Sequence, residues 1–340
     1  MSTRSAGLLW RSGHSKISPV MPAPDTRLKC LLCSHEHLKV LASLTGREIR
    51  KLWHERDLVF PPEALAGIDE DSSVILWACA RCGFQFFDSA LAGNSLFYEL
   101  LEPADYYSPD RPEFQRTTRF AVKHRLRNVL DVGCGTGSFL DLARQAGLQT
   151  FGLELNPKAA GKARAKGHQI FDRLLHELPP DACPGGFDMI TLFQVLEHVP
   201  DPVGILNEAY AQLKPGGFIS IAVPNKLGIG RFMPWDPAQW PPHHISRWGL
   251  PDFKTLASRT NLRLETSGGD LLLGTAINHT FSWHTKLSAA INRRPVPKAG
   301  AWLGLFSWGY RKSGMKYFAP RWGSSIYAFF QKSENVGEHP

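Results

Sequence analysis

Between residues 128 and 270 the chain alternates short apolar runs with longer amphipathic segments. The apolar runs predict buried strands at 129–132, 150–155, 169–171, 187–193 and 218–223. The amphipathic segments predict helices at 138–146, 157–166, 202–213 and 250–259. A strand at 262–266 and a last strand at 325–331 follow. This alternation is typical of a parallel sheet with helices on both faces.

The pattern before residue 128 is different. Short apolar runs at 75–78 and 84–87 predict two small strands around a pair of cysteines. From 91 to 128 the spacing is helical, and the turn at 108–110 divides two helices.

These shifts divide the chain into seven parts. We expect a disordered tail at 1–27, a zinc-ribbon-like module at 28–90, a helical linker or lid at 91–127, an α/β core at 128–270, a basic, aromatic-rich helical insertion at 271–323, the last core strand at 324–333, and a tail at 334–340.

Composition limits the class of protein. With 340 residues, 43% of them hydrophobic and 21% charged, the chain is too long for a disulfide miniprotein and too apolar for a disordered one. Four of its six cysteines form two C-x-x-C pairs, which favours a reducing compartment. Because no apolar run reaches 18 residues, we expect a cytoplasmic protein without a spanning helix.

The net charge of +8 is concentrated near the C-terminus. Residues 271–333 hold nine cations and no acid, so the rest of the chain carries 8 − 9 = −1. This uneven distribution of charge argues against a protein that binds nucleic acid over its whole surface. Together with its tryptophans, the segment predicts peripheral contact with an anionic membrane, at the inner face. Packing on the sheet, a dimer contact and binding of an anionic acceptor explain the same charges, and the oligomeric state stays open.

The two cysteine pairs predict a metal site. Cys30, Cys33, Cys79 and Cys82 have the spacing of thiolate knuckles, and two knuckles make a tetrahedral zinc site. The alternative is four reduced, buried thiols. A closed set of four thiolates leaves no position for substrate, so this Zn²⁺ would be structural.

A glycine-rich loop follows the first core strand. Gly133, Gly135 and Gly137 lie between that strand and a helix, where the backbone can approach a ligand closely. Glu154 ends the next strand, in position to accept hydrogen bonds from ribose hydroxyls. No Gly-Lys-Ser/Thr follows, which disfavours a phosphate-binding P-loop.

Five motifs in order, at 129–137, 152–154, 187–190, 196–202 and 213–217, resemble a class I S-adenosylmethionine-dependent methyltransferase. The likeness is to the ubiquinone-type and sugar methyltransferases, some with an N-terminal cysteine-rich zinc module. It implies a Rossmann-like, doubly wound, seven-stranded sheet with a small zinc ribbon and a helical insertion before the last strand.

The resemblance also assigns residues to S-adenosyl-L-methionine. The glycines would face its methionine half, Asp131 would orient the loop and approach the amino group, and Glu154 would hold the ribose. The remaining cofactor residues would be Leu155 and Asp172 at the adenine and Phe193 and Gln194 at the reaction side.

The loop at 241–248 lies beyond the fifth strand, where this fold binds acceptors. We predict His243 or His244 as the general base and Arg247 as a ligand for an anionic part of the substrate. Structural capping of the loop is the alternative for the histidines. Tyr106 and Tyr107 are predicted to close over the site, with linker packing as their alternative.

The sequence therefore predicts in-line methyl transfer to a small or lipid-linked acceptor, with a saccharide among the candidates. Two alternatives remain. One is an RNA methyltransferase that uses the ribbon as a clamp, and the other is a catalytically silent module that binds the cofactor.

Overall fold

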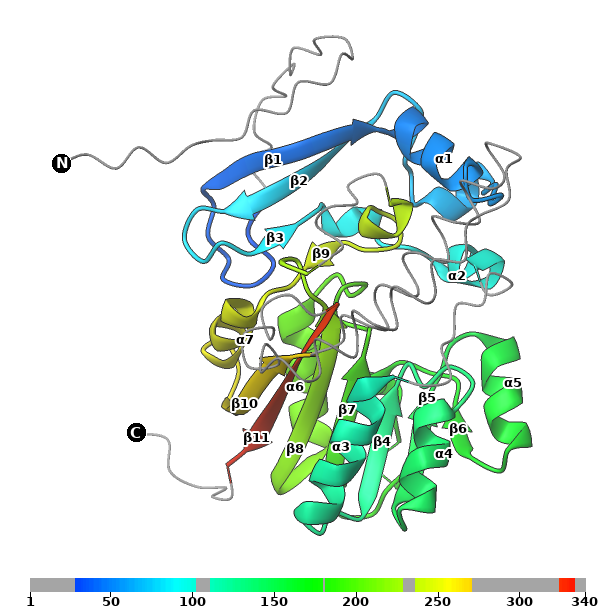
Figure 1. The fold of residues 1–340 in the computed structure, drawn as a ribbon, viewed down its shortest axis with the longest axis vertical. Coiled ribbons are helices and arrows are strands. Elements are labelled where there is room, and N and C mark those ends of the chain that lie inside the picture. The colour runs from blue at the N-terminus through cyan, green and yellow to red at the C-terminus, as the bar shows by residue number, and fades with distance from the viewer. Residues whose placement is uncertain (1–27, 102–110, 180, 229–235, 271–323, 334–340) are drawn as a thin grey trace, which may run out of the picture.

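The computed structural model describes residues 28–101, 111–179, 181–228, 236–270 and 324–333. Its main feature is a seven-stranded mixed sheet of order β10-β11-β8-β7-β4-β5-β6 (Figure 1). Its strands are β4 (Asn128–Val132), β5 (Gln149–Leu153), β6 (Gln169–Phe171), β7 (Phe187–Phe193), β8 (Leu213–Pro224), β10 (Leu262–Gly269) and β11 (Ser325–Lys332). The predicted fold class, an α/β protein with a seven-stranded sheet, is confirmed.

The five strands β8, β7, β4, β5 and β6 run parallel to one another. Strand β11 lies between β8 and β10 and runs antiparallel to both. The last predicted strand thus enters the sheet instead of extending its edge. Its apolar side chains Ile326, Ala328 and Phe330 are buried, which explains why a segment so far along the chain belongs to the core.

Helices cover both faces of this sheet (Figure 1). On one face lie α3 (Pro112–Lys123), α4 (Ser138–Gln145) and α5 (Pro157–Ala165), whose Phe114, Phe139 and Ala160 belong to one apolar cluster. On the other lie α6 (Pro202–Gln212) and α7 (Leu250–Ala257), which bury Leu206 and Phe253 in a second cluster. The arrangement is doubly wound, and the carboxyl ends of β4, β5 and β7 share one edge.

A small sheet of order β1-β2-β3-β9 lies beyond that edge (Figure 1). Its strands are β1 (Leu38–Thr45), β2 (Ser73–Cys79), β3 (Gln85–Phe86) and β9 (Ser246–Arg247). The predicted ribbon strands correspond to β2 and β3. Strand β9 comes from the predicted acceptor loop, so this sheet joins two segments far apart in sequence.

Short helices complete this end of the molecule. They are α1 (Gly46–His54), α2 (Ser95–Leu101) and the 3₁₀ helices η1 (Pro62–Leu65), η2 (Ser89–Leu91), η4 (Leu175–Glu177) and η6 (Pro237–Gln239). A third apolar cluster joins Trp53 of α1, Phe60, Phe97 of α2 and Trp240. It packs the N-terminal region onto the acceptor loop.

Several predictions fall outside the described residues. These are Tyr106, Tyr107, the insertion at 271–323 and the tails at 1–27 and 334–340. Among the described residues, no helix is both long enough and apolar enough to cross a bilayer.

Candidate functional site

A cavity of about 800 Å³ opens at the carboxyl edge of the large sheet. It is lined by the glycine loop after β4, by residues that follow β5 and β7, and by His243 and His244 of the acceptor loop. Its volume is in the usual range of ligand sites, about 300–1,000 Å³. Most of the predicted cofactor and base residues therefore meet in one place.

The glycine loop is held in shape by Glu154. The carboxylate accepts one hydrogen bond from the Gly135 amide and another from the Asn156 amide, each 2.8 Å long. Gly133 and Gly135 have φ of 71° and 55°, a conformation that glycine adopts without strain. Because a carboxylate offers about four lone-pair positions, both oxygens can still accept bonds from a ligand hydroxyl.

Asp131 lies in the cavity wall with almost no exposure. The Thr191 hydroxyl donates to its Oδ1 over 2.6 Å. Burial raises the pKa of Asp131 to about 7, while the Thr191 hydrogen bond opposes that shift and the nearby charge of Glu154 adds to it. A cationic ligand group beside this carboxylate would stabilise its charged form.

The predicted adenine side is apolar. Leu155 is 56% exposed and Leu174 is 46% exposed, and both line the cavity. Apolar side chains that face a cavity in this way suit an aromatic ring. Asp172 instead forms an exposed ion pair with Arg164, 3.7 Å apart, and is not part of the cavity wall.

Gly137 also lies outside the wall. It is the N-cap of α4 with φ of 80°, and a Cβ there would come within 3.0 Å of the His168 ring. A glycine at this position allows α4 to pack closely against the segment after α5. Gly133 and Gly135, in contrast, line the cavity.

Phe193 and Gln194 line the cavity at the end of β7, as their predicted place requires. Gln194 Nε2 donates to Glu113 Oε1 over 3.2 Å, and Glu113 is buried at the start of α3. Burial raises the pKa of Glu113. This carboxyl group was not among the predicted residues.

Three imidazoles meet at another part of the cavity wall. His198, which follows β7, lies with ring centroids 4.7 Å from His243 and 5.0 Å from His244, and the last two rings stack at 4.4 Å. Burial lowers the pKa of His198 to about 4 and that of His243 to about 3, and it holds the pKa of His244 well below its usual value. All three rings are therefore neutral at pH 7. We call them the histidine cluster.

Glu197 lies beside this cluster. Its Oε1 is 3.8 Å from His198 Nε2, and the side chain is almost completely buried. Neither carboxylate oxygen has a hydrogen-bond partner within the described part of the chain. Burial raises the pKa of Glu197 to about 8, although its own backbone amide and the charge of Arg111 oppose the shift.

The loop that carries two of these histidines is held by backbone hydrogen bonds from both sides. The Ile245 amide donates to the Glu197 carbonyl over 2.8 Å, and the Phe87 amide donates to the Ile245 carbonyl over 2.9 Å. The residues next to Phe87 and Ile245 form the antiparallel pairing of β3 with β9. The N-terminal module therefore fixes the loop relative to the core.

Arg247 does not line the cavity. Its guanidinium donates to the Gln239 carbonyl over 2.9 Å and lies 5.5 Å from the ring centroids of Phe87 and Trp240. Burial lowers its pKa to about 10. Its predicted substrate contact stays a prediction.

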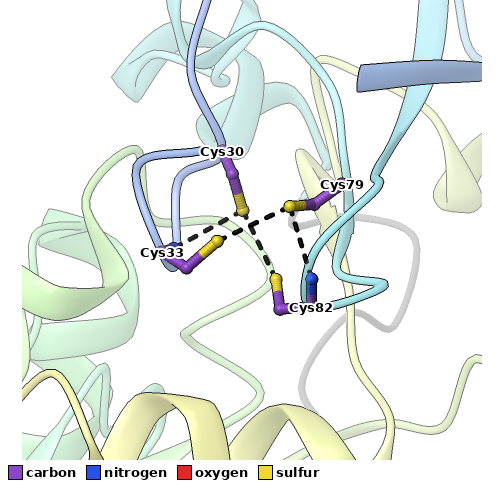
Figure 2. A group of neighbouring side chains, drawn as sticks. All are labelled: Cys30, Cys33, Cys79 and Cys82. Atoms are coloured by element: carbon purple, nitrogen blue, oxygen red, sulfur yellow. Dashed lines mark hydrogen bonds between the residues drawn. The ribbon is translucent and has the colours of Figure 1, made fainter. Parts of the chain in front are cut away.

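The four predicted metal ligands come together (Figure 2). Sγ atoms are 3.7 Å apart for Cys30 and Cys82 and 3.5 Å apart for Cys33 and Cys79. A tetrahedral zinc ion with Zn–S bonds of about 2.3 Å needs sulfur atoms about 3.8 Å apart. The thiols fit that ion, and the Cys33 and Cys82 amides point at Sγ of Cys30 and Cys79 as in a knuckle. Structural Zn²⁺ is thus suggested by the donor set and stays a prediction.

Glu197 and Tyr98 also line the cavity and were not predicted from the sequence. Glu113, likewise not predicted, is in contact with the lining residue Gln194 and is not itself part of the wall. Glu197 and His198 stand in the quoted motif at 196–202, but only the tertiary contact with the acceptor loop gives them their surroundings. Tyr98 lies on α2, and its hydroxyl is 3.5 Å from the His243 carbonyl oxygen.

Comparison with known proteins agrees with this architecture. A family profile described as "Methyltransferase domain" matches residues 105–267. A ubiquinone biosynthesis O-methyltransferase of Pseudomonas paraeruginosa is 31% identical over 107 residues, which is 29% of this chain and 45% of that protein. The corresponding protein of Idiomarina loihiensis is 36% identical over 105 residues, 29% of this chain and 43% of that protein. The chain thus spans less than half the length of these relatives.

Two solved structures are similar to part of this chain. The crystal structure of a SAM-dependent methyltransferase from Archaeoglobus fulgidus is 15% identical, with a TM-score of 0.45, and the match covers 69% of this chain and 100% of that one. The plantazolicin methyltransferase BpumL in complex with SAH matches with 14% identity and a TM-score of 0.42, over 65% of this chain and 82% of that one.

Proposed function

Because residues 105–267 form a methyltransferase domain of the class I, S-adenosylmethionine-dependent type, we propose that the protein methylates a small molecule in the cavity described above. The observation that carries the proposal is the shared cavity. Asp131 and Glu154 line it beside the glycine loop, and the histidine cluster with Glu197 lines it elsewhere.

The residues present fit S-adenosylmethionine. Glu154 would accept hydrogen bonds from the ribose hydroxyls through its remaining lone pairs, and Leu155 would pack on the adenine. Asp131 would pair with the amino group of the methionine half, which compensates the cost of its buried charge. When bound, this cofactor supplies a methyl group on a sulfonium, which leaves in line for the acceptor while the bonding pair stays on sulfur.

The protein has two further tasks, which are to orient the acceptor and to receive its proton. We assign both to the side of the cavity formed by Glu197, His243 and His244. An imidazole whose pKa is about 3 holds a proton poorly on its own, so His243 would not act as an isolated base. The proposed proton acceptor is the histidine cluster together with Glu197, whose pKa of about 8 is better matched to a hydroxyl acceptor.

The ubiquinone-pathway relatives are named as O-methyltransferases, which favours a hydroxyl group as the acceptor. The apolar wall and the buried imidazoles suit a compact, weakly polar molecule such as a phenol. No contact or comparison favours the saccharide or lipid-linked acceptor expected from the sequence, and the proposal does not include them.

The first test is calorimetric titration with S-adenosylmethionine and S-adenosylhomocysteine. We expect binding of both, followed by transfer of isotope-labelled methyl to members of a panel of small phenols and catechols. Failure to bind either nucleoside would overturn the proposal. Binding without transfer to any acceptor would instead favour the silent binding module.

The proton acceptor is tested separately. In a His243→Gln, His244→Gln variant that still binds S-adenosylhomocysteine, we expect a loss of turnover of about 100-fold or more, typical of general acid–base groups. His54→Ala is the control, because His54 is exposed at the end of α1. Unchanged turnover in the double variant would remove the cluster from the mechanism.

A further inference from the structure

The histidine cluster has the features of a metal site. We propose that His198, His243 and His244 bind a divalent transition-metal ion, with Glu197 beside it, on the acceptor side of the cavity. The inference rests on the proposed function, because it specifies how the acceptor is held and how it loses its proton.

The ring nitrogens of the histidine cluster lie close together. One nitrogen of each of the three imidazoles lies within 4.8 Å of those of the other two. Ligand nitrogens around a tetrahedral ion with bonds of about 2.1 Å are about 3.4 Å apart, so modest side-chain rotations would complete the site. The three rings come from two segments, after β7 and before β9, that are separated by more than forty residues in sequence.

Backbone carbonyls fix the tautomers of two of the rings. His198 Nδ1 faces the His243 carbonyl oxygen, and His243 Nδ1 faces the Ala238 carbonyl oxygen at 3.0 Å. A carbonyl only accepts, so both Nδ1 atoms carry the proton and both Nε2 atoms carry a lone pair. This hydrogen bond from the distal nitrogen to a carbonyl is the common way of orienting a histidine ligand.

Glu197 adds a buried carboxyl group beside the rings. Both of its oxygens lack hydrogen-bond partners in the described structure although the side chain is buried. A carboxylate left in this state costs several kcal/mol unless it is protonated or paired with a cation. A dication held by three imidazoles, next to an oxygen 3.8 Å from His198 Nε2, would place a positive charge directly beside this carboxylate.

The donor set also indicates which ions would bind. Three imidazoles and an oxygen donor suit Zn²⁺, Fe²⁺, Co²⁺ or Ni²⁺ better than Mg²⁺ or Ca²⁺.

Such an ion would have a direct use in the proposed reaction. Three protein ligands leave an open position, as in catalytic metal sites. An acceptor hydroxyl bound there becomes more acidic. With the three imidazoles holding the ion, Glu197 alone would receive the proton. The oxygen would form the bond to the methyl carbon while the bond between that carbon and sulfur breaks, with its electron pair staying on sulfur.

The test uses metal-depleted, reduced full-length protein titrated with Co²⁺. The four thiols account for one equivalent, which gives an intense thiolate charge-transfer band in the near ultraviolet. We expect a second equivalent of Co²⁺ to bind. Its visible absorption bands should appear without an increase in the thiolate charge-transfer band, because nitrogen and oxygen ligands do not give that band. Elemental analysis after gel filtration counts both ions.

Variants assign the second equivalent. His243→Gln, His244→Gln should lose it and keep the first, and Glu197→Gln should weaken it about 10- to 100-fold, the usual effect of removing a group that supports the ligands. His54→Ala should keep both. A single equivalent in the wild type overturns the inference, as does a double variant that retains two.

Binding of S-adenosylhomocysteine is measured on the same samples. If the nucleoside binds and only one equivalent of Co²⁺ is taken up, the inference fails while the proposed function stands. If the nucleoside does not bind, the proposed function fails, and the count of Co²⁺ still decides whether the histidine cluster is a metal site. The wild-type spectrum decides even if the double variant does not fold.

Discussion

If Asp131 pairs with the amino group of the cofactor, as proposed, binding should depend on pH. Its pKa in the unliganded protein is about 7, mainly because the side chain is buried. Only the ionised carboxylate can pair with the amino group of a methionine moiety. The apparent dissociation constant is the intrinsic one divided by the ionised fraction, which is about 0.1 at pH 6 and about 0.9 at pH 8. We therefore expect S-adenosylhomocysteine to bind about tenfold more weakly at pH 6 than at pH 8.

The matched variant is Asp131→Asn. The amide oxygen can still accept the Thr191 hydroxyl hydrogen, which spans 2.6 Å in the wild type, so the local structure should persist. Losing a charge-assisted hydrogen bond should weaken binding at pH 8 by about 1.5–3 kcal/mol, or roughly 10- to 150-fold. The change in affinity between pH 6 and pH 8 should disappear.

The same pKa predicts an effect on the stability of the unliganded protein. A carboxyl whose pKa rises from 3.8 to about 7 on folding stabilises the fold fully below pH 3.8, and this contribution is lost as pH rises through 7. At pH 8 the ionised Asp131 therefore costs on the order of 4 kcal/mol, and Asp131→Asn should be more stable than the wild type by about that amount. At pH 4 the two proteins should unfold alike.

Calorimetric titration at pH 6, 7 and 8 and urea unfolding at pH 4 and 8 check both effects. A wild-type affinity that does not change between pH 6 and pH 8 would refute the reasoning. An Asn variant with the same pH dependence as the wild type would equally show that another group titrates.

Three further predictions concern the loop, the core and the cysteines. Glu154→Gln places an NH₂ group against the Gly135 or Asn156 amide, so S-adenosylhomocysteine affinity measured by calorimetry should fall about 10- to 100-fold; an unchanged affinity contradicts the assignment. Gly152→Ala sets a Cβ 2.6 Å from Cys134 Sγ, and urea unfolding should show a loss of about 1–3 kcal/mol, whereas Gly161→Ala, with open space around it, should not destabilise. Cys82→Ser should lose bound zinc and speed hydrogen exchange in the 243–248 segment, while Cys183→Ser, outside the four-thiol group, should do neither.

The sequence allowed the large sheet to be predicted because its strands are local, strongly apolar runs. β4, β6 and β7 lie within a residue of their expected bounds. β1 was missed, since most of its side chains are exposed or half-buried and its apolar pattern is weak. β9 was missed for another reason. It has only two residues and forms only because β3, more than 150 residues earlier in the chain, lies beside it.

The candidate site was predictable only where its residues lie close together in the sequence. The glycine loop, Asp131 and Glu154 belong to one strand–loop–helix unit and its neighbouring strand, so their proximity followed from local order. The environment of Glu197 depends on the fold as a whole. Its raised pKa comes from burial by segments that are distant in sequence, which no spacing reveals.

The small sheet explains why a cysteine-rich module accompanies this cavity. A two-residue strand such as β9 has too few hydrogen bonds to hold the acceptor loop by itself. It pairs with β3, which begins three residues after Cys82, so the thiol group fixes the strand against which the loop is aligned. The Phe87 amide extends this pairing to Ile245, and Ile245 in turn bonds to Glu197 at the edge of the large sheet. A metal ion at the four thiols would therefore help to position His243 and His244 without touching a substrate, because it stiffens the only sheet to which their loop belongs within the described residues.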